Sequence, residues 1–420
     1  MRSSIQRFAL MAILTGAMTT FFSAGAALSQ ALDLFRAATP PDIEAAAGAS
    51  KRAGAARERV AALNDGALAE APALRITLFP GVVATFSKTG SETADGGGRI
   101  WTGSDGAGGE ATLVFARGKV TGQVQLDGRA FEIRGAGGSR AHRIIEVDAA
   151  RLPPEGPLTV PKDLPERKSG TLPDASSAAA AGRTRITVLI AYTEAAKAAA
   201  DDILAEADLA VSLANQGYKA SGVKIRLKLA GTILVTGYDE SSASWEDTLN
   251  NLSGSTDAPN PAPFAGVRKK RNRTEADLVV LLRSESQPAY CGLGHYIEEP
   301  GSGTSKFAYS EVELSCVSNH SVAHEMGHNM GLNHDRYVVG SAPKSAYNFG
   351  YVLPRKRVRS IMAYNNRCAD AGFNCTRLNR FSDPDATVEN KPFGVEQGEK
   401  GAADAARRLN ETRTAIAAYR

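Results

Sequence analysis

Cysteine and long apolar runs are scarce in this sequence, and each shortage excludes a class of protein. No cysteine occurs before Cys291. Beyond the first two dozen residues, no segment reaches the roughly 20 apolar residues that a bilayer-spanning helix needs. The one dense basic run, residues 269–273, has no interleaved aromatic side chains to stack on bases. We therefore expect neither a membrane span in the processed chain nor a nucleic-acid partner.

Residues 1–26 have the three-part layout of a cleaved export signal. Arg2 and Arg7 precede an apolar stretch at 8–22, and small residues follow at 24–26 or 27–29. The stretch is short and is interrupted by threonines and a glycine, so it fits a signal better than an anchor. We expect export to the periplasm or the medium.

All four cysteines lie in the last third of the chain, and an even number in an exported protein indicates disulfides. Three pairings are possible. We favour Cys291 with Cys316 and Cys368 with Cys375, because each pair encloses a short local loop.

Residues 27–150 are expected to form a small β-rich domain. Residues 151–185 are rich in Pro, Ser, Ala and basic side chains, which is typical of an exposed linker, and Arg183 and Arg185 are candidate cleavage sites. The predicted strands, separated by glycine turns, are 74–79, 82–87, 111–115, 119–126 and 130–134.

Residues 186–420 alternate strands and helices, which indicates an α/β domain with a mostly parallel sheet. The helix predicted at 201–218 has its apolar residues on one face and Asp201 and Asp202 at its N-terminus. A helix at 401–419 closes the chain. The predicted strands are 186–192, 223–235 and 276–282, with shorter ones near 292–297 and 307–314.

The pattern H-E-x-x-H-x-x-G-x-x-H runs from His324 to His334. His324 and His328 lie one helical turn apart, so both imidazoles can reach one metal ion. Glu325 can reach a water at that ion without being a ligand. Gly331 allows a left-handed residue at the helix end, and the resulting reversal brings His334 up as the third ligand.

Three nitrogen ligands leave a fourth coordination position open, which is typical of a catalytic zinc site. A chance H-E-x-x-H in a chain of this length has a frequency of roughly one per cent or less, and the added Gly331 and His334 lower it about a thousandfold. His320 is interpreted as a surface or cap residue, and His142 and His295 as structural. We predict one catalytic zinc; the sequence does not decide whether calcium also supports the fold.

A Ser-Ile-Met turn at residues 360–362 follows the histidine pattern, and the combination resembles the metzincin clan. That resemblance implies a twisted, mostly parallel sheet with an active-site helix, and an apolar floor beneath the metal formed by Met362. Asp335 resembles the buried aspartate of the adamalysin or reprolysin branch, which braces the site. Tyr364 is similar instead to the astacin and serralysin tyrosine, which implies a switching ligand, an oxyanion donor or simply a wall.

Most of the stretch from about 186 to 420 is similar to the bacterial peptidyl-Asp metallopeptidase family, which is reprolysin-like. That resemblance implies cleavage on the amino side of acidic residues, and hence a cation in the pocket that follows the scissile bond. The sequence leaves seven basic side chains of this region open for that role: Arg355, Lys356, Arg357, Arg359, Arg367, Arg377 and Arg380. The segments that carry the resemblance are 276–282, 291–294, the histidine helix, 361–365, 379–384 and 409–413.

These observations predict an exported, monomeric zinc endopeptidase acting on proteins or peptides, with Glu325 as general base and substrate paired to an exposed strand at 292–297. The β-rich region is expected to be an inhibitory propeptide. Having no cysteine, it cannot block zinc through a thiolate and must use a carboxylate or occlusion. The alternatives are a catalytically silent binding protein, a zinc amidase acting on a non-protein substrate and, for the β-rich region, a permanent accessory module.

Overall fold

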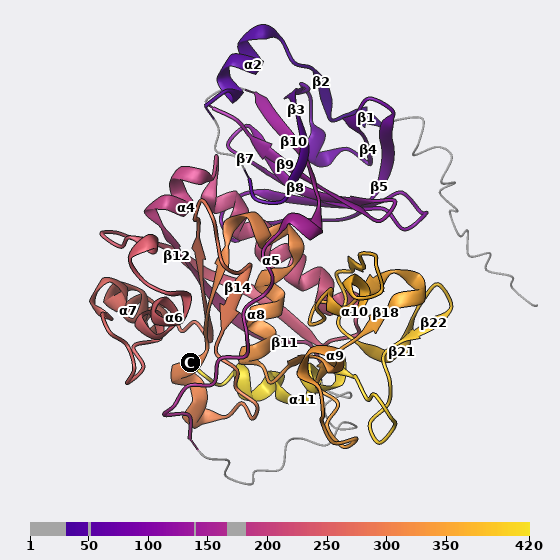
Figure 1. Ribbon diagram of the computed structural model, residues 1–420. Helices are drawn as coiled ribbons and strands as arrows, with labels where there is room; N and C mark the ends of the chain where they lie inside the picture. The colour runs from indigo at the N-terminus through magenta and orange to yellow at the C-terminus, as the bar shows by residue number, and fades with distance from the viewer. Residues whose placement is uncertain (1–30, 49–51, 138–139, 166–181) are drawn as a thin grey trace, which may run out of the picture.

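The computed structural model describes residues 31–48, 52–137, 140–165 and 182–420. Figure 1 shows the N-terminal region, in indigo to magenta, stacked on one end of a larger region that contains the histidine helix. The predicted export signal lies outside the described residues, as do residues 166–181 of the predicted linker. No helix in the described part of the chain is both long and apolar enough to cross a bilayer.

The described N-terminal residues form one ten-stranded sheet with the order β1-β4-β5-β6-β7-β8-β9-β10-β3-β2. All neighbouring strands pair antiparallel except β1 and β4. A short helix, α2 (Pro40–Ala46), follows β2. The strands are β1 (Leu32–Asp33), β2 (Phe35–Ala37), β3 (Ala55–Leu63), β4 (Ala73–Phe79), β5 (Val82–Thr93), β6 (Arg99–Ser104), β7 (Glu110–Ala116), β8 (Lys119–Leu126), β9 (Arg129–Gly135) and β10 (Ala141–Val147).

The β-rich N-terminal region expected from the sequence is confirmed, but half of its strands were missed. β3 and β10 pair with each other and carry charged residues, Arg57-Glu58-Arg59 on β3 and Arg143 and Glu146 on β10, among small and aliphatic ones. Arg143 binds Glu58 at 2.6 Å and Arg57 binds Glu146 at 2.6 Å across the two strands. Cross-strand ion pairs stabilise such a ladder without the continuous apolar pattern that marks a strand in sequence.

The second region is built around a five-stranded sheet, order β12-β11-β13-β15-β14, in which only β14, at one edge, runs antiparallel to its neighbour. The predicted mixed α/β class is confirmed. Its elements are β11 (Thr184–Thr193), α4 (Glu194–Ala199), α5 (Ile203–Ala220), β12 (Ile225–Val235), α6 (Trp245–Ser253), α7 (Ala265–Arg273), β13 (Leu278–Arg283), β14 (Gly292–Gly294), β15 (Tyr309–Glu313), α8 (Ser321–Asn329), β16 (Asn333–Asp335), α9 (Arg336–Val339), β17 (Phe349–Gly350), β18 (Val352–Leu353), β19 (Val358–Arg359), α10 (Asn366–Ala369), β20 (Thr376–Arg377), β21 (Asp383–Val388), β22 (Lys391–Phe393) and α11 (Ala405–Ile416).

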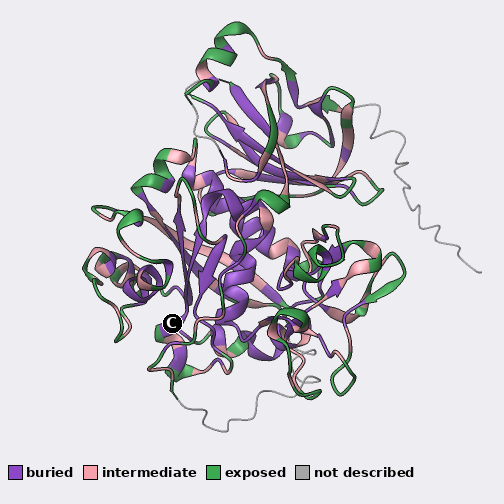
Figure 2. Ribbon diagram, viewed as in Figure 1, coloured by how far each residue is buried: buried purple, intermediate pink, exposed green. Residues whose placement is uncertain are grey.

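Side chains of the central strands alternate between two cores, one on each face of the sheet. On β11, Val188 and Ile190 pack with α5, α8 and α11, whereas Leu189 and Ala191 pack with α6 and α7. A strand covered on both faces is apolar throughout, which is why β11 was recognised from sequence. Figure 2 shows this buried centre, with α8 inside it. Helices α6 and α7 were not predicted.

Helix α5 joins the two regions. Its residues Ala205, Leu209 and Leu213 pack against Ile100 and Val114 of the N-terminal sheet. Beside this apolar contact lies a buried ion-pair network formed by Arg52 and Glu132, 3.2 Å apart, and by Arg134 and Glu206, 2.5 Å apart. The N-terminal region is therefore docked on α5 through buried apolar contacts and buried ion pairs.

Asp208 of α5 lies in this docking surface and is expected to titrate there. It is 2% exposed, it accepts a hydrogen bond from the Gly96 N–H at 2.9 Å, and burial raises its pKa from 3.8 to about 6. A raised carboxyl pKa favours the folded state when the group is protonated, so this contribution is lost as pH rises through about 6. We expect the melting temperature of the full chain to fall more steeply between pH 4.5 and 7 than that of Asp208→Asn, by calorimetry.

Asp127→Asn is the control, because Asp127 has a 77% exposed side chain and a φ of 50° that asparagine tolerates. Its melting curve should follow that of the unmodified chain at every pH. Equal pH slopes in the unmodified chain and in Asp208→Asn would contradict the assignment.

Candidate metal centre and its cleft

Helix α8 and the turn after it bring the three predicted histidines together. His324 and His328 are buried in α8, and Gly331 follows with a φ of +94°. The Leu332 N–H donates to Gly327 O at 2.9 Å, which closes the turn and leads into β16 with His334. A side chain at Gly331 would also lie 3.0 Å from Glu298 O. The sequence pattern predicted a left-handed conformation at Gly331, and the turn after α8 requires it.

The three imidazoles are arranged as metal ligands. One ring nitrogen from each lies within 4.8 Å of the others, and the Nε2 atoms of His324 and His328 are 3.1 Å apart. The Nδ1 atoms of these two rings lie 2.8 Å from the carbonyls of Ile361 and Leu332. A carbonyl only accepts, so Nδ1 carries the hydrogen and Nε2 is left with a lone pair facing the centre.

Burial keeps these rings neutral. It lowers the pKa of His328 to about 4 and those of His324 and His334 well below their ordinary value. The Nε2 atom of His334 is buried without a hydrogen-bond partner among the described residues. Three buried imidazoles with free lone pairs are the donor set that a zinc ion takes. Among the described residues, this triad is the one group of His, Cys, Asp and Glu found suitable for a metal.

Met362 packs directly against the histidine helix. It is fully buried, and a Cβ added at Gly327 would lie 2.7 Å from its sulfur. The turn that holds it is closed by the Ala363 N–H donating to Ser360 O at 3.1 Å. Met362 therefore lies against α8 at the level of His324 and His328, where the resemblance to metzincins implies an apolar floor.

Asp335 ties the third histidine to the methionine turn. Its two carboxylate oxygens accept hydrogen bonds from the N–H groups of Tyr337 at 3.0 Å and Tyr364 at 2.8 Å. The side chain is buried, and it caps the short helix α9. The bracing geometry implied by the reprolysin resemblance is present.

The side chain of Glu325 extends from helix α8 toward the edge strand β14. Cβ atoms at Gly292 and Gly294 would lie 2.7 and 3.1 Å from its carboxylate oxygens, so these two glycines make its space. Burial raises the pKa of Glu325 well above its ordinary value, and the neighbouring charge of Glu155 adds to the effect. The glycines were recognised in sequence only as part of a family resemblance; their role is to make room for this side chain.

The segment after the N-terminal sheet occupies the cleft beside β14. The Cys291 N–H donates to Pro154 O at 2.7 Å, Gly156 N–H to Gly292 O at 2.8 Å, and Tyr296 N–H to Thr159 O at 2.8 Å. Thr159 and His295 form a parallel bridge. The sequence predicted an exposed linker and an exposed strand at these positions. Both predictions are wrong here, because residues 154–159 and residues 291–296 form backbone hydrogen bonds with each other.

Tyr364 faces both the triad and this segment. Its ring centre lies 4.4 Å from that of His334, and its hydroxyl donates to the carbonyls of Glu155 at 2.9 Å and Gly156 at 2.6 Å. The Glu155 carboxylate accepts from Ser321 Oγ at 2.7 Å and from the Arg377 guanidinium. Sequence reasoning named Arg377 only within a group of basic residues and missed Glu155 and Ser321, which no local pattern distinguishes.

The other singled-out side chains lie outside the histidine triad. Both favoured disulfides, Cys291–Cys316 and Cys368–Cys375, are confirmed. His295 is buried with Nε2 3.2 Å from Ser253 Oγ, and His142 Nε2 accepts from the Val120 N–H at 2.9 Å. His320 caps α8 by position, but it is 2% exposed, so the surface interpretation is wrong.

Comparison with known proteins agrees with this geometry. Residues 182–382 match the profile of metallo-peptidase family M12 (Reprolysin_5). A peptidyl-Asp metalloendopeptidase of Stenotrophomonas maltophilia strain R551-3 is 33% identical over 76% of this chain and 72% of its own length. The chain belongs to the family of the peptidyl-Asp metalloendopeptidases. A Xanthomonas campestris protein of the same name is 30% identical over 87% of this chain and 86% of its own length. The predicted enzyme class, a zinc metalloendopeptidase, and the predicted relationship to the peptidyl-Asp family are confirmed.

The contact between Gly327 and Met362 predicts a test of the packing below the triad. Gly327→Ala should destabilise the folded chain by about 1–3 kcal/mol, because the new methyl group displaces the Met362 sulfur or the helix. Gly266→Ala is the control: it is also helical, and its nearest neighbour would be Ile233 Cδ1 at 3.8 Å, so it should be neutral or stabilising by up to about 1 kcal/mol. Denaturant unfolding of both variants measures the difference; equal effects would refute the packing argument.

Proposed function

We propose that this chain is made as an exported, latent precursor of a zinc endopeptidase that cleaves before acidic residues. The observation that carries the proposal is the convergence of His324, His328 and His334 beside Glu325, in a cleft whose edge strand can pair with a peptide. Membership of the family supports the enzyme class. We further propose a bound zinc ion, roles for the residues around it, a preference for acidic residues after the cleaved bond, export of the chain and inhibition by its N-terminal region.

The three histidines would hold the zinc through Nε2 and leave its remaining position to face the cleft. When bound, zinc polarises the scissile carbonyl and lowers the pKa of an attacking water. Glu325 would accept that water's proton and pass it to the leaving amine. Tyr364, whose hydroxyl already donates to two peptide carbonyls, would donate to the oxygen that becomes negative.

Latency would come from residues 27–150 together with the segment that follows them. That segment pairs with β14, and its Gly156 carbonyl accepts the hydrogen bond of the Tyr364 hydroxyl. It also brings the Glu155 carboxylate next to Glu325. No substrate can enter the cleft while the segment is in place. Among the candidate cleavage sites, Arg183 is exposed and precedes β11, whereas Arg185 lies inside that paired strand. Cleavage at Arg183 or upstream would release the blocking segment and leave the sheet intact.

Export is supported by the signal-like residues 1–26 and by two disulfides, which persist in oxidising compartments. The preference for acidic residues is supported by the name of the relatives, peptidyl-Asp metalloendopeptidase. The test is cleavage of a peptide library by the processed chain, with and without a zinc chelator, read by mass spectrometry. Chelator-sensitive cuts before Asp or Glu are expected; a zinc-loaded chain that cuts nothing would reject the proposal.

Replacing Glu325 tests the general base. Glu325→Gln should bind one zinc per chain but lower kcat by about 10²–10⁴-fold, because the amide cannot accept the water's proton. Metal analysis and peptide cleavage by the processed protein measure the two effects. The exposed Glu298→Gln is the control and should retain activity. Near-full activity in Glu325→Gln would exclude the assigned role.

Replacing Gly156 tests the latency. A Cβ there would lie 2.7 Å from Gly292 O and would collide with Leu293, so Gly156→Ala should lift the segment from β14. We expect peptidase activity of the uncleaved full chain to rise about 10-fold or more, from an overpacking cost of about 1–3 kcal/mol. Gly182→Ala is the matched control, because no atom lies within 4 Å of its added Cβ.

Both variants are assayed as intact chains, and electrophoresis verifies that no processing has occurred. If Gly156→Ala is as silent as Gly182→Ala although the processed enzyme is active, the segment is not what holds the precursor inactive.

A further inference from the structure

A buried ion pair connects the blocking segment to the wall of the cleft. Arg377 Nη1 contacts Glu155 Oε1, and the two side chains are only 3% and 2% exposed. The same carboxylate oxygen accepts from Ser321 Oγ at 2.7 Å, and the same guanidinium nitrogen donates to Asn319 O at 3.0 Å. Buried charges are costly unless they are paired, so this contact is a specific one.

The arginine half of the pair is fixed by the catalytic region alone. Arg377 lies on β20, which pairs in parallel with β19, and the Asn319 carbonyl holds its guanidinium. Its Nε atom is buried without a hydrogen-bond partner in the described part of the chain. When the blocking segment leaves, a preorganised cation with free donors remains beside the cleft.

This cation is next to the catalytic residues. Ser321 begins helix α8, one turn before Glu325, and the backbone carbonyl of Glu155 accepts from Tyr364, whose ring contacts His334. In a productively bound peptide, the carbonyl at the oxyanion donor belongs to the residue before the scissile bond. The blocking segment runs parallel to β14, opposite to the antiparallel direction in which we expect a substrate to pair with this edge strand. With its direction reversed, the segment places the Glu155 carbonyl at Tyr364 and the Glu155 side chain on the side of the residue that follows the scissile bond.

The neighbouring basic side chains do not offer the same site. Arg359 is buried, but it donates to the backbone carbonyls of Cys375 and Ala363. Arg355, Arg357 and Arg367 are exposed. Of the basic residues singled out from the sequence, Arg377 is the one whose guanidinium is buried and paired with a carboxylate in the cleft.

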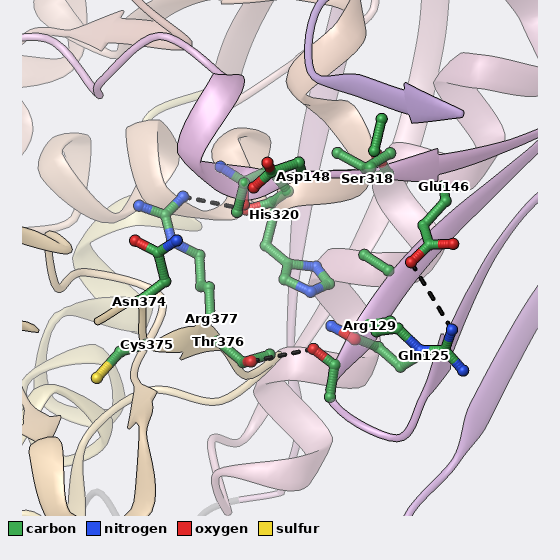
Figure 3. A pocket seen from close by; sticks show the side chains of 16 residues that line it. Gln125, Arg129, Glu146, Asp148, Ser318, His320, Asn374, Cys375, Thr376 and Arg377 are labelled. Atoms are coloured by element: carbon green, nitrogen blue, oxygen red, sulfur yellow. Dashed lines mark hydrogen bonds and ion pairs between the residues drawn. The ribbon is translucent and has the colours of Figure 1, made fainter. Parts of the chain in front are cut away.

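A cavity of about 320 Å³ lies on the boundary between the two regions, and Arg377 lines it. Figure 3 shows Ser318, His320 and Thr376 of the second region together with Arg129 and Glu146 of the N-terminal region around this cavity. The N-terminal region supplies the second wall, so its departure opens the surroundings of Arg377 to solvent and to an incoming side chain.

We propose that Arg377, assisted by Ser321, binds the acidic side chain that follows the scissile bond, and that Glu155 occupies this subsite as an internal substrate mimic until processing. The inference rests on the proposed endopeptidase function and names its specificity-determining residue. A guanidinium binds carboxylates through directed, charge-assisted hydrogen bonds and offers nothing equivalent to an amide side chain.

The test compares Arg377→Gln with the exposed control Arg355→Gln. Each full chain is folded with its N-terminal region, loaded with zinc, processed by limited trypsin treatment and separated from the released region. Substrates are paired peptides with Asp or Asn after the scissile bond. Arg377→Gln should lower kcat/KM for the Asp peptide by about 30-fold or more and for the Asn peptide by less than about 3-fold. Arg355→Gln should keep the native ratio.

A second readout does not need turnover. Calorimetry measures binding of the synthetic peptide Pro-Pro-Glu-Gly-Pro-Leu, the sequence of residues 153–158, to the processed chains. Its Gln analogue should bind the unmodified protein about 30-fold more weakly, but should bind Arg377→Gln as well as the Glu peptide does. Should Arg377→Gln fail to fold, Arg377→Lys and the Glu–Gln comparison on the unmodified protein decide the question.

The outcomes are distinct. An unmodified enzyme that cuts no peptide rejects the proposed function, while peptide binding still reports on the acid subsite. An enzyme that cuts before Asp with a ratio unaffected by Arg377→Gln, or that binds the Glu and Gln peptides alike, overturns the assignment of Arg377.

Discussion

Close approach of the histidine helix to its neighbours is the constraint on which the site depends. Gly292 and Gly294 let β14 pass beside Glu325, and Gly327 lets Met362 lie against the opposite side of the helix. A methyl group at any of these three positions would displace a functional side chain or its support. The helix is thereby clamped between the sheet edge and the methionine turn, and the orientation of its imidazoles follows from that clamp together with their carbonyl partners.

The part of the site that is local in sequence was predictable. The spacing of His324 and His328, and the glycine that turns the chain toward His334, follow from helix geometry and from the freedom of glycine. Met362 and Asp335 came from resemblance, because no local rule brings a turn some 30 residues away beneath a helix. Strands with continuous apolar runs were also found, since burial on both faces leaves a plain pattern.

What sequence could not supply was the pairing of groups far apart in the chain. Glu155 and Arg377 are separated by 222 residues and read separately as surface charges. The strands β3 and β10 lack the apolar pattern that marks a strand in sequence. Their charged residues form ion pairs only when the two strands lie side by side. The segment around Gly156 has the composition of a linker, yet it is ordered because β14 offers it hydrogen bonds.

The docking face of α5 has a consequence for the proposed processing. Ala205, Leu209 and Leu213 are buried only because the N-terminal sheet covers them. The proposed removal of that sheet would leave the same side chains on the water-facing surface, where contiguous apolar area promotes self-association. Under the proposed processing, tight docking of the N-terminal region and colloidal solubility of the released second region would therefore be opposed. Each apolar contact that strengthens the docking would add to the apolar area exposed after release.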